Sequence, residues 1–197
     1  MTGFRKDLRH LTWDEVFARQ EQRAFLLPAW MEALHLGVGA HVLDLGAGPG
    51  YVSLRLAAHV GPTGLVYAVD REPDAIASLR KRLRRDDVTN VRCVVADVLQ
   101  FSVEEEEASR VSAALLAMML HHSDDPAALI GQLTRLLPAG ARAVIAEFHP
   151  DGPAHSGPPN DARIAPERIE QWLQQAGLHV LDYTRQSDEH YMLTVQC

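Results

Sequence analysis

A glycine-rich turn after a short apolar segment is the part of this sequence with the clearest chemical meaning. Residues 41–45 read as a buried strand, and Gly46, Gly48 and Gly50 follow at alternate positions. Glycines at this spacing let the backbone turn sharply and come close to a ligand lying across the strand end. The helix expected next offers unpaired N–H groups to a carboxylate. A plain strand-to-helix turn needs only one glycine, so this spacing favours a ligand site.

The same spacing argues against a dinucleotide ligand. The dinucleotide fingerprint has two residues between its second and third glycines, whereas only one residue separates Gly48 from Gly50. The third glycine of that fingerprint would fall on Tyr51, whose side chain would crowd a pyrophosphate. A cofactor without phosphates fits better, and a nicotinamide-dependent dehydrogenase stays open as an alternative that predicts NAD binding.

Two carboxylates follow the next two expected strands. Asp70 ends the strand expected at 65–69, where a carboxylate can accept hydrogen bonds from both hydroxyls of a ribose. Its alternative role is to cap the helix that begins near Pro73. Asp97 follows the strand expected at 91–95 and is either a binding residue or an ordinary turn residue.

Ionisable side chains also follow the fourth and fifth expected strands. His121 and His122 come shortly after 113–118, and Glu147 and His149 lie at the end of 141–148. Because histidine titrates near neutral pH, His121 and His122 are candidate catalytic bases, and a packing or capping pair is the alternative. No histidine or cysteine spacing matches a known zinc pattern, so no metal site is predicted.

The elements that position these residues alternate between strands and helices, which predicts an α/β fold with a mainly parallel sheet. Five strand–helix units precede two last strands, at 178–184 and 190–195. Their short polar connection demands a hairpin, so the last strand runs antiparallel. The fold class is therefore a doubly wound, Rossmann-like sheet of seven strands with helices on both faces. Residues 1–36 are expected to form an N-terminal helical cap and residues 37–197 the cofactor-binding domain.

Composition narrows the function further. A formal net charge of −7 opposes general nucleic-acid binding, and the basic run at 80–85 reads as a solvated helix end. Two cysteines allow no disulfide framework and indicate a reducing compartment. The sequence contains no signal-peptide core and no apolar stretch of membrane length, so the expected location is the cytoplasm. The expected partner is a small molecule, and a homodimer is left open.

Several segments, in order along the chain, resemble the motifs of class I S-adenosylmethionine-dependent methyltransferases. They are 42–57 for the first motif, 66–70 for the second, 93–97 for the third, 115–126 for the fourth, and 136–140 for an L-x-P-G-G turn with alanine for one glycine. The similarity covers roughly residues 35–195. It is nearest to the bacterial branch related to ubiquinone and menaquinone C-methyltransferases.

The resemblance implies that S-adenosylmethionine is the cofactor and assigns its contacts. Asp44 would hold the methionine amino group directly or through water, Asp70 the ribose and Asp97 the adenine amino group. The whole implied set is Asp44, Gly46, Ala47, Gly48, Gly50, Tyr51, Asp70, Arg71, Asp97, Val98, Ala117 and Met118. Either Arg19 or Arg23 would bind the methionine carboxylate.

The resemblance also implies the reaction, which is displacement at a sulfonium-bound methyl group, with a small molecule as acceptor. The protein would mainly align the reactants and exclude water. His121 and His122 would lie on the acceptor side, together with the candidate substrate residues Glu147 and His149. A base is needed only if the acceptor loses a proton. A cofactor-binding sensor or partner subunit without transferase activity is the alternative.

Overall fold

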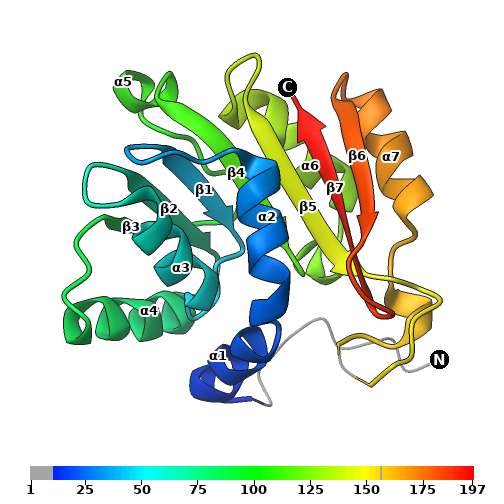
Figure 1. The fold of residues 1–197 in the computed structure, drawn as a ribbon, viewed down its shortest axis with the longest axis horizontal. Helices are drawn as coiled ribbons and strands as arrows, with labels where there is room; N and C mark the ends of the chain where they lie inside the picture. The colour runs from blue at the N-terminus through cyan, green and yellow to red at the C-terminus, as the bar shows by residue number, and fades with distance from the viewer. Residues whose placement is uncertain (1–10, 156) are drawn as a thin grey trace.

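The computed structural model describes residues 11–155 and 157–197, which form a seven-stranded sheet with the order β3-β2-β1-β4-β5-β7-β6 (Figure 1). Strands β1 to β5 are parallel, and β7 is antiparallel to both β5 and β6. The strands are β1 (His41–Leu45), β2 (Leu65–Asp70), β3 (Val91–Val95), β4 (Val111–Ala117), β5 (Arg142–Phe148), β6 (His179–Arg185) and β7 (His190–Gln196). This confirms the predicted fold class, including the hairpin that reverses the last strand.

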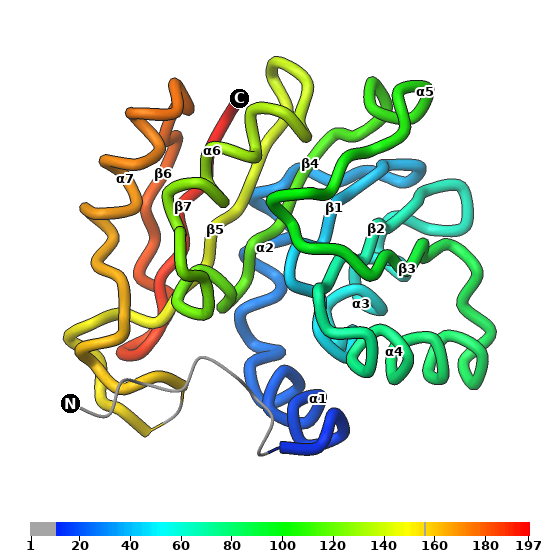
Figure 2. Tube along the Cα trace, turned by 180° about the vertical axis from the view of Figure 1, so that it is seen from behind, coloured from blue at the N-terminus to red at the C-terminus, as the bar shows by residue number. Residues whose placement is uncertain are grey.

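The helices cover both faces of the sheet. Helices α2, α3 and α4 pack on one face, and α6 and α7 pack on the other (Figures 1 and 2). The α-helices are α1 (Trp13–Gln22), α2 (Leu27–Leu34), α3 (Tyr51–Val60), α4 (Pro73–Arg85), α5 (Glu105–Ala108), α6 (Pro126–Leu136) and α7 (Pro166–Gln175), with short 3₁₀ turns at Ala24–Leu26, Leu120–His122 and Asn160–Ala162. Among the described residues, no helix is long and apolar enough to cross a membrane.

Side-chain alternation along the strands explains why both faces are covered. Val42 packs into the apolar cluster under α2 and α3, while Leu43 and Leu45 pack into the cluster under α6 and α7. Because neighbouring strand residues point to opposite faces, a strand that is buried on both faces has to be apolar throughout. Strand β1 is buried along its whole length, and its one charged residue, Asp44, is therefore unusual.

Helix α1 is held against helices α3 and α4. Asp14 pairs with Arg82 of α4, and the Phe17 ring meets the Tyr51 ring edge-on at a centroid distance of 5.3 Å. After a break at residues 23–26, α2 begins with Pro28 in its first turn, where proline fits a helix, and its Trp30 donates to Gln186. The division of the chain at residue 36 stays a prediction, and the first ten residues of the expected cap lie outside the described residues.

Candidate functional site

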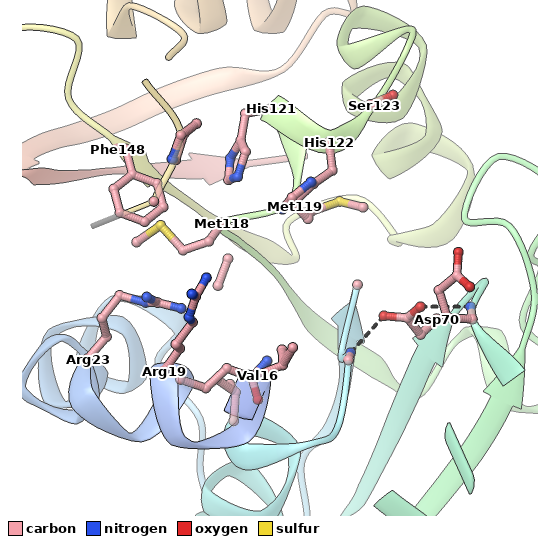
Figure 3. A pocket seen from close by; sticks show the side chains of 18 of the residues that line it. Val16, Arg19, Arg23, Asp70, Met118, Met119, His121, His122, Ser123 and Phe148 are labelled. Atoms are coloured by element: carbon pink, nitrogen blue, oxygen red, sulfur yellow. Dashed lines mark hydrogen bonds between the residues drawn. The ribbon is translucent and has the colours of Figure 1, made fainter. Parts of the chain in front are cut away.

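A cavity of about 1120 Å³ opens where the parallel strands end. Helix α1 lines one wall, and the glycine turn and the ends of β2 and β3 line a second. Residues 117–119 and 121–125, with Ala154, His155, Gly157 and Pro158, complete the lining. Figure 3 shows Asp70 on one side of the cavity, and Arg19, Arg23 and Phe148 on the other. The cavity therefore joins the predicted cofactor side to the predicted acceptor side.

Gly46, Gly48 and Gly50 have two different structural roles, which are lining the cavity and packing against α4. All three have positive φ, at 81° for Gly46, 57° for Gly48 and 90° for Gly50, a region that favours glycine. Gly46 and Gly48 line the cavity with bare backbone. A Cβ on Gly50 would lie only 2.2 Å from Leu79, so this glycine is required by packing against α4.

Two neighbours of these glycines also lie away from the cavity. Gly50, Ala47 and Tyr51 were all expected to contact the cofactor, but none of them is among the residues that line this cavity. Ala47 is buried in the small cluster under α4, and Tyr51 instead lines a separate surface groove beside α2. The alternating glycines therefore indicate the turn correctly but overstate how many of its residues face the cavity.

Gln20 of α1 is a part of the site that the sequence did not reveal. Its Nε2 donates to the Ala47 carbonyl at 3.3 Å, and its Oε1 accepts from the Tyr51 backbone N–H at 3.1 Å. One of the unpaired N–H groups expected at the start of α3 is thus bound by protein and not by a ligand. A glutamine on an amphipathic helix carries no sequence signal for such a contact, since most such residues face solvent.

Asp70 is held firmly at the end of β2. Its Oδ2 accepts from the Gly48 N–H at 2.7 Å and its Oδ1 from the Glu72 N–H at 2.9 Å. Burial raises its pKa, while these two N–H donors oppose the shift. Glu72, not Asp70, is the residue at the N-cap of α4, and no side chain caps that helix. Asp70 therefore connects the glycine turn to the β2 end and lines the cavity with its carboxylate.

The next wall contains the residues expected to contact an adenine. Arg71, Asp97 and Val98 all line the cavity. Asp97 accepts from the Leu99 N–H at 2.9 Å, which fits a turn role as well, and Val98 is buried. Their contact with an adenine stays a prediction.

Asp44 lies beneath the glycine turn and is not among the residues that line the cavity. It is 3% exposed, and its Oδ2 accepts a hydrogen bond from the Ser53 hydroxyl of α3. Burial raises its pKa to about 7, against the opposing hydrogen bond from Ser53. The contact with a methionine amino group, directly or through water, stays a prediction.

The raised pKa of Asp44 predicts an unusual pH dependence of stability. Because the fold disfavours the ionised form, this group stabilises the protein most below pH 3.8 and contributes less as the pH rises to about 7. Asp44→Asn cannot ionise but can still accept from Ser53. Between pH 5 and 7, the unfolding free energy of the variant minus that of the unmodified protein should increase by up to about 1.4 kcal/mol per pH unit. Urea unfolding at three pH values measures this, and parallel pH curves for the two proteins would contradict it.

Strand β4 ends in strained backbone at the cavity. Met118 has a φ of 55°, which is uncommon for a residue with a side chain, and its N–H donates to the Ala146 carbonyl at 2.8 Å. Such strain persists only where the surroundings enforce it and is concentrated at functional sites. Ala117, Met118 and Met119 all line the cavity, as expected for the first two of them.

Beside this bend, His121 and Glu147 form a buried pair. His121 Nδ1 lies 2.7 Å from Glu147 Oε2, while Oε1 of the same carboxylate accepts from the Leu120 N–H at 2.8 Å. Burial raises the pKa of Glu147, but His121 and the backbone donors outweigh it and lower that pKa overall. An ionised Glu147 accepts from Nδ1–H, which makes Nε2 the basic nitrogen of a neutral His121 ring.

The positions of Glu147 and His149 differ from the expectation that they form the acceptor rim. Residues 143 and 145 of β5 point to the face under α6 and α7, and by alternation so does Glu147, which is 1% exposed. Phe148 points the other way and lines the cavity. His149 is also buried and accepts from the Asp151 N–H, outside the cavity lining. Glu147 therefore orients His121, and Phe148 takes the place expected for Glu147.

Both histidines of the pair at 121–122 line the cavity, as predicted (Figure 3). Their ring centroids are 4.2 Å apart, and the His121 ring meets the Phe148 ring edge-on at 5.6 Å. His121 has the buried carboxylate behind it, whereas His122 lies nearer to Met119. Within the described ranges, 11–155 and 157–197, no group of three or more His, Cys, Asp or Glu residues is arranged to hold a metal ion.

Comparison with known proteins agrees with this geometry. A family defined as a methyltransferase domain matches residues 36–194. A 2-phytyl-1,4-naphtoquinone methyltransferase of Nostoc punctiforme is 33% identical over 112 residues, which are 56% of this chain and 47% of that protein. A protein-L-isoaspartate O-methyltransferase of Ignicoccus hospitalis is 35% identical over 97 residues, which are 47% of this chain and 46% of that protein. The chain thus spans about half the length of these curated relatives.

Solved structures share the fold at low sequence identity. A SAM-dependent methyltransferase from Aquifex aeolicus superposes with a TM-score of 0.82 at 18% identity, covering 94% of this chain and 98% of that one. The 1,6-didemethyltoxoflavin-N1-methyltransferase of Burkholderia thailandensis, solved with bound 1,6-didemethyltoxoflavin and S-adenosylhomocysteine, gives a TM-score of 0.68 at 21% identity, covering 93% of this chain and 85% of that one. At these identities the likeness establishes the architecture alone.

Proposed function

Because the chain belongs to the class I S-adenosylmethionine-dependent methyltransferases, we propose that it methylates a small organic molecule bound between α1 and the His121 turn. The observation that carries this proposal is the His121–Glu147 pair. It puts an oriented base in the same cavity as the carboxylate of Asp70. A recess lined by the nearly buried side chains of His121 and Phe148 suits a small molecule better than a flat protein surface.

The residues of the cavity fit the cofactor. Gly46 and Gly48 present bare backbone, and a Cβ on Gly46 would lie 2.9 Å from Met119, so a side chain there would fill the space. Asp70 would hold the ribose. The adenine would be surrounded by Arg71, Asp97 and Val98. The sulfur end of the cofactor would lie beside Ala117 and Met118. When bound, S-adenosylmethionine supplies a methyl group on a positively charged sulfur, which keeps the electron pair of the broken C–S bond.

The protein then contributes alignment and proton removal. The strained Met118 backbone and the buried Phe148 shape the recess and exclude water from it. His121 Nε2 accepts the proton of the acceptor as the new bond to carbon forms, and Glu147 stabilises the resulting imidazolium through Nδ1. Glu147 is thus a positioning residue, and His121 is the catalytic base.

Transfer of a radioactive methyl group tests the proposed acceptor class. Purified protein is incubated with tritium-labelled S-adenosylmethionine and a cell extract that is separated by size into small molecules and macromolecules. We expect label in a product of the small-molecule fraction. Label found only in protein would overturn the small-molecule acceptor. Cofactor binding without any labelled product would favour the alternative of a non-catalytic sensor or partner subunit.

Substitutions of His121 and Glu147 should lower the turnover number more than a substitution of the neighbouring His122. We expect His121→Ala to lower the turnover number by about 100-fold or more, since a positioned base contributes 10²–10⁴-fold, and Glu147→Gln to lower it by about 10-fold. Affinity for S-adenosylhomocysteine should stay within about twofold, because neither residue belongs to the predicted cofactor set. The matched control is His122→Ala, which removes the neighbouring ring from the same cavity. Normal turnover in both His121→Ala and Glu147→Gln would make the pair structural.

A further inference from the structure

Arg19 of α1 and Arg23, the C-cap residue of that helix, differ from Arg163 in what surrounds them. Arg19 and Arg23 lie one helical turn apart, so they share a face of the helix, and both line the cavity. Figure 3 shows both side chains extending toward Met118 and Phe148. Within residues 11–155 and 157–197, no hydrogen bond or ion pair joins either guanidinium to a carboxylate or carbonyl oxygen.

Arg163 shows how this protein satisfies an arginine that has only a structural role. Its guanidinium also lies over the Phe148 ring, at 5.3 Å from the centroid. It donates to the carbonyls of Pro158 and His149 at 3.0 Å and lies 3.5 Å from the Glu189 carboxylate. A buried guanidinium needs such acceptors, because an unmatched charge loses its hydration without compensation.

Arg23 is half-buried and lacks an equivalent set of acceptors. Its guanidinium carbon lies 5.7 Å from the Phe148 centroid, and burial, followed by the charge of Arg19, lowers its pKa. The two carboxylates that act on it from a distance are Glu147 and Glu189. Glu147 is engaged by His121, and Glu189 by Arg163 and the His155 N–H. An anion that enters the cavity would supply the missing acceptor.

The two arginines line the same side of the cavity but have different neighbours (Figure 3). Arg19 adjoins Gln20, whose amide contacts the glycine turn on the cofactor side. Arg23 lies against Phe148, and the Phe148 ring in turn contacts His121, the proposed base. Arg23 is therefore the arginine that Phe148 connects to the proposed base.

We propose that Arg23 binds a carboxylate of the methyl acceptor, so that the acceptor is a small organic acid whose reacting atom faces His121; this inference rests on the proposed function. Arginine suits the role because its planar fork binds a carboxylate through two parallel hydrogen bonds. The thioether of Met118 offers an adaptable apolar surface to the body of such an acid. Arg19 is left to the methionine carboxylate of the cofactor.

The test compares acids with their own amides, which have the same shape but no charge. Intact protein saturated with S-adenosylhomocysteine is titrated with benzoate, salicylate, 4-hydroxybenzoate and hexanoate, and with the four matching amides, and binding is followed by ligand-observed NMR. At least one acid should bind about 10-fold or more tightly than its amide, the size expected of a charge-assisted hydrogen bond. Arg23→Gln should remove that preference while the affinity for S-adenosylhomocysteine changes less than twofold.

Arg19→Gln gives the opposite pattern and serves as the matched variant. It should weaken S-adenosylhomocysteine about 10-fold and keep the preference for the acid. Arg168→Gln, an exposed arginine over Trp172 in α7, should change neither. No acid preference in cofactor-loaded protein, or an Arg23→Gln variant that loses S-adenosylhomocysteine affinity as Arg19→Gln should, overturns the assignment of Arg23. Failure of the unmodified protein to bind S-adenosylhomocysteine overturns the proposed function as well, so the two failures are distinct.

Discussion

Asp70→Asn is expected to weaken the binding of S-adenosylhomocysteine by about 100-fold, because hydrogen bonds to a charged group contribute about 1.5–3 kcal/mol each and a ribose offers two hydroxyl donors. The Asp70 carboxylate lines the cavity while both of its oxygens accept from backbone N–H groups. Those donors fix its position before a ligand arrives, so little ordering is lost on binding. The side-chain NH₂ group of an asparagine would also face the backbone N–H of Gly48 or of Glu72, so that two donors would meet without an acceptor. Titration calorimetry measures the affinity directly.

A second carboxylate separates this effect from a general loss of negative charge. Asp182→Asn changes an exposed residue on β6 whose side chain accepts from the Thr184 hydroxyl, and it should leave the affinity unchanged. Thermal unfolding of Asp70→Asn shows that the variant is folded when it is titrated. Equal affinity of the folded Asp70→Asn variant and the unmodified protein would remove Asp70 from the ribose site.

Gly50→Ala is expected to lower the free energy of unfolding by about 3 kcal/mol, the sum of a left-handed backbone penalty and core overpacking. The φ of Gly50 is 90°, and the added Cβ would lie 2.2 Å from Leu79 Cδ1 and 2.9 Å from Leu79 Cγ. Leu79 is fully buried and cannot move aside without displacing α4 from the sheet. Urea unfolding of the cofactor-free protein measures the loss.

Substitutions of two other glycines separate the backbone penalty from the steric contact with Leu79. Gly140 has a φ of 85° but open space around its Cβ position, so Gly140→Ala should show the backbone penalty alone, about 1–2 kcal/mol. Gly131 lies inside α6, also in open space, and Gly131→Ala should stabilise the protein by up to about 1 kcal/mol. A Gly50→Ala variant no less stable than Gly140→Ala would show that the contact with Leu79 does not constrain the turn.

The fold was predictable because its signals are local. Apolar runs of five to seven residues alternate with helical patterns, and the short polar link at 186–189 permits only a hairpin. The sequence does not predict the position of β7, which lies between β5 and β6 and not at the edge of the sheet. Strand order depends on packing between distant segments, and no local pattern encodes it.

The cofactor side of the site was predictable in part. Gly46, Gly48 and Asp70 line the cavity because the ends of parallel strands meet at one edge of the sheet. Gly50 shares the sequence pattern of the other two glycines but serves packing instead. The printed sequence does not distinguish a bare backbone that receives a ligand from one that receives Leu79.

The acceptor side was less predictable. Glu147 was expected at the rim, and the alternation of side chains in β5 turns it to the opposite face, beneath His121, while Phe148 faces the cavity. The inward and outward positions of β5 could have been assigned from its neighbours Ile145 and Ala146, had the position of the helices been known. Gln20 and Arg23 come from a helix whose docking onto the turn only the three-dimensional structure reveals.

A crystal structure of the intact protein with S-adenosylhomocysteine tests the central claim most directly. We expect the ribose hydroxyls within hydrogen-bonding distance of Asp70, and the sulfur beside Met118 on the side that faces His121 and Phe148. Electron density for the ligand in the groove beside α2, or with its sulfur turned away from the His121 side, would contradict the account.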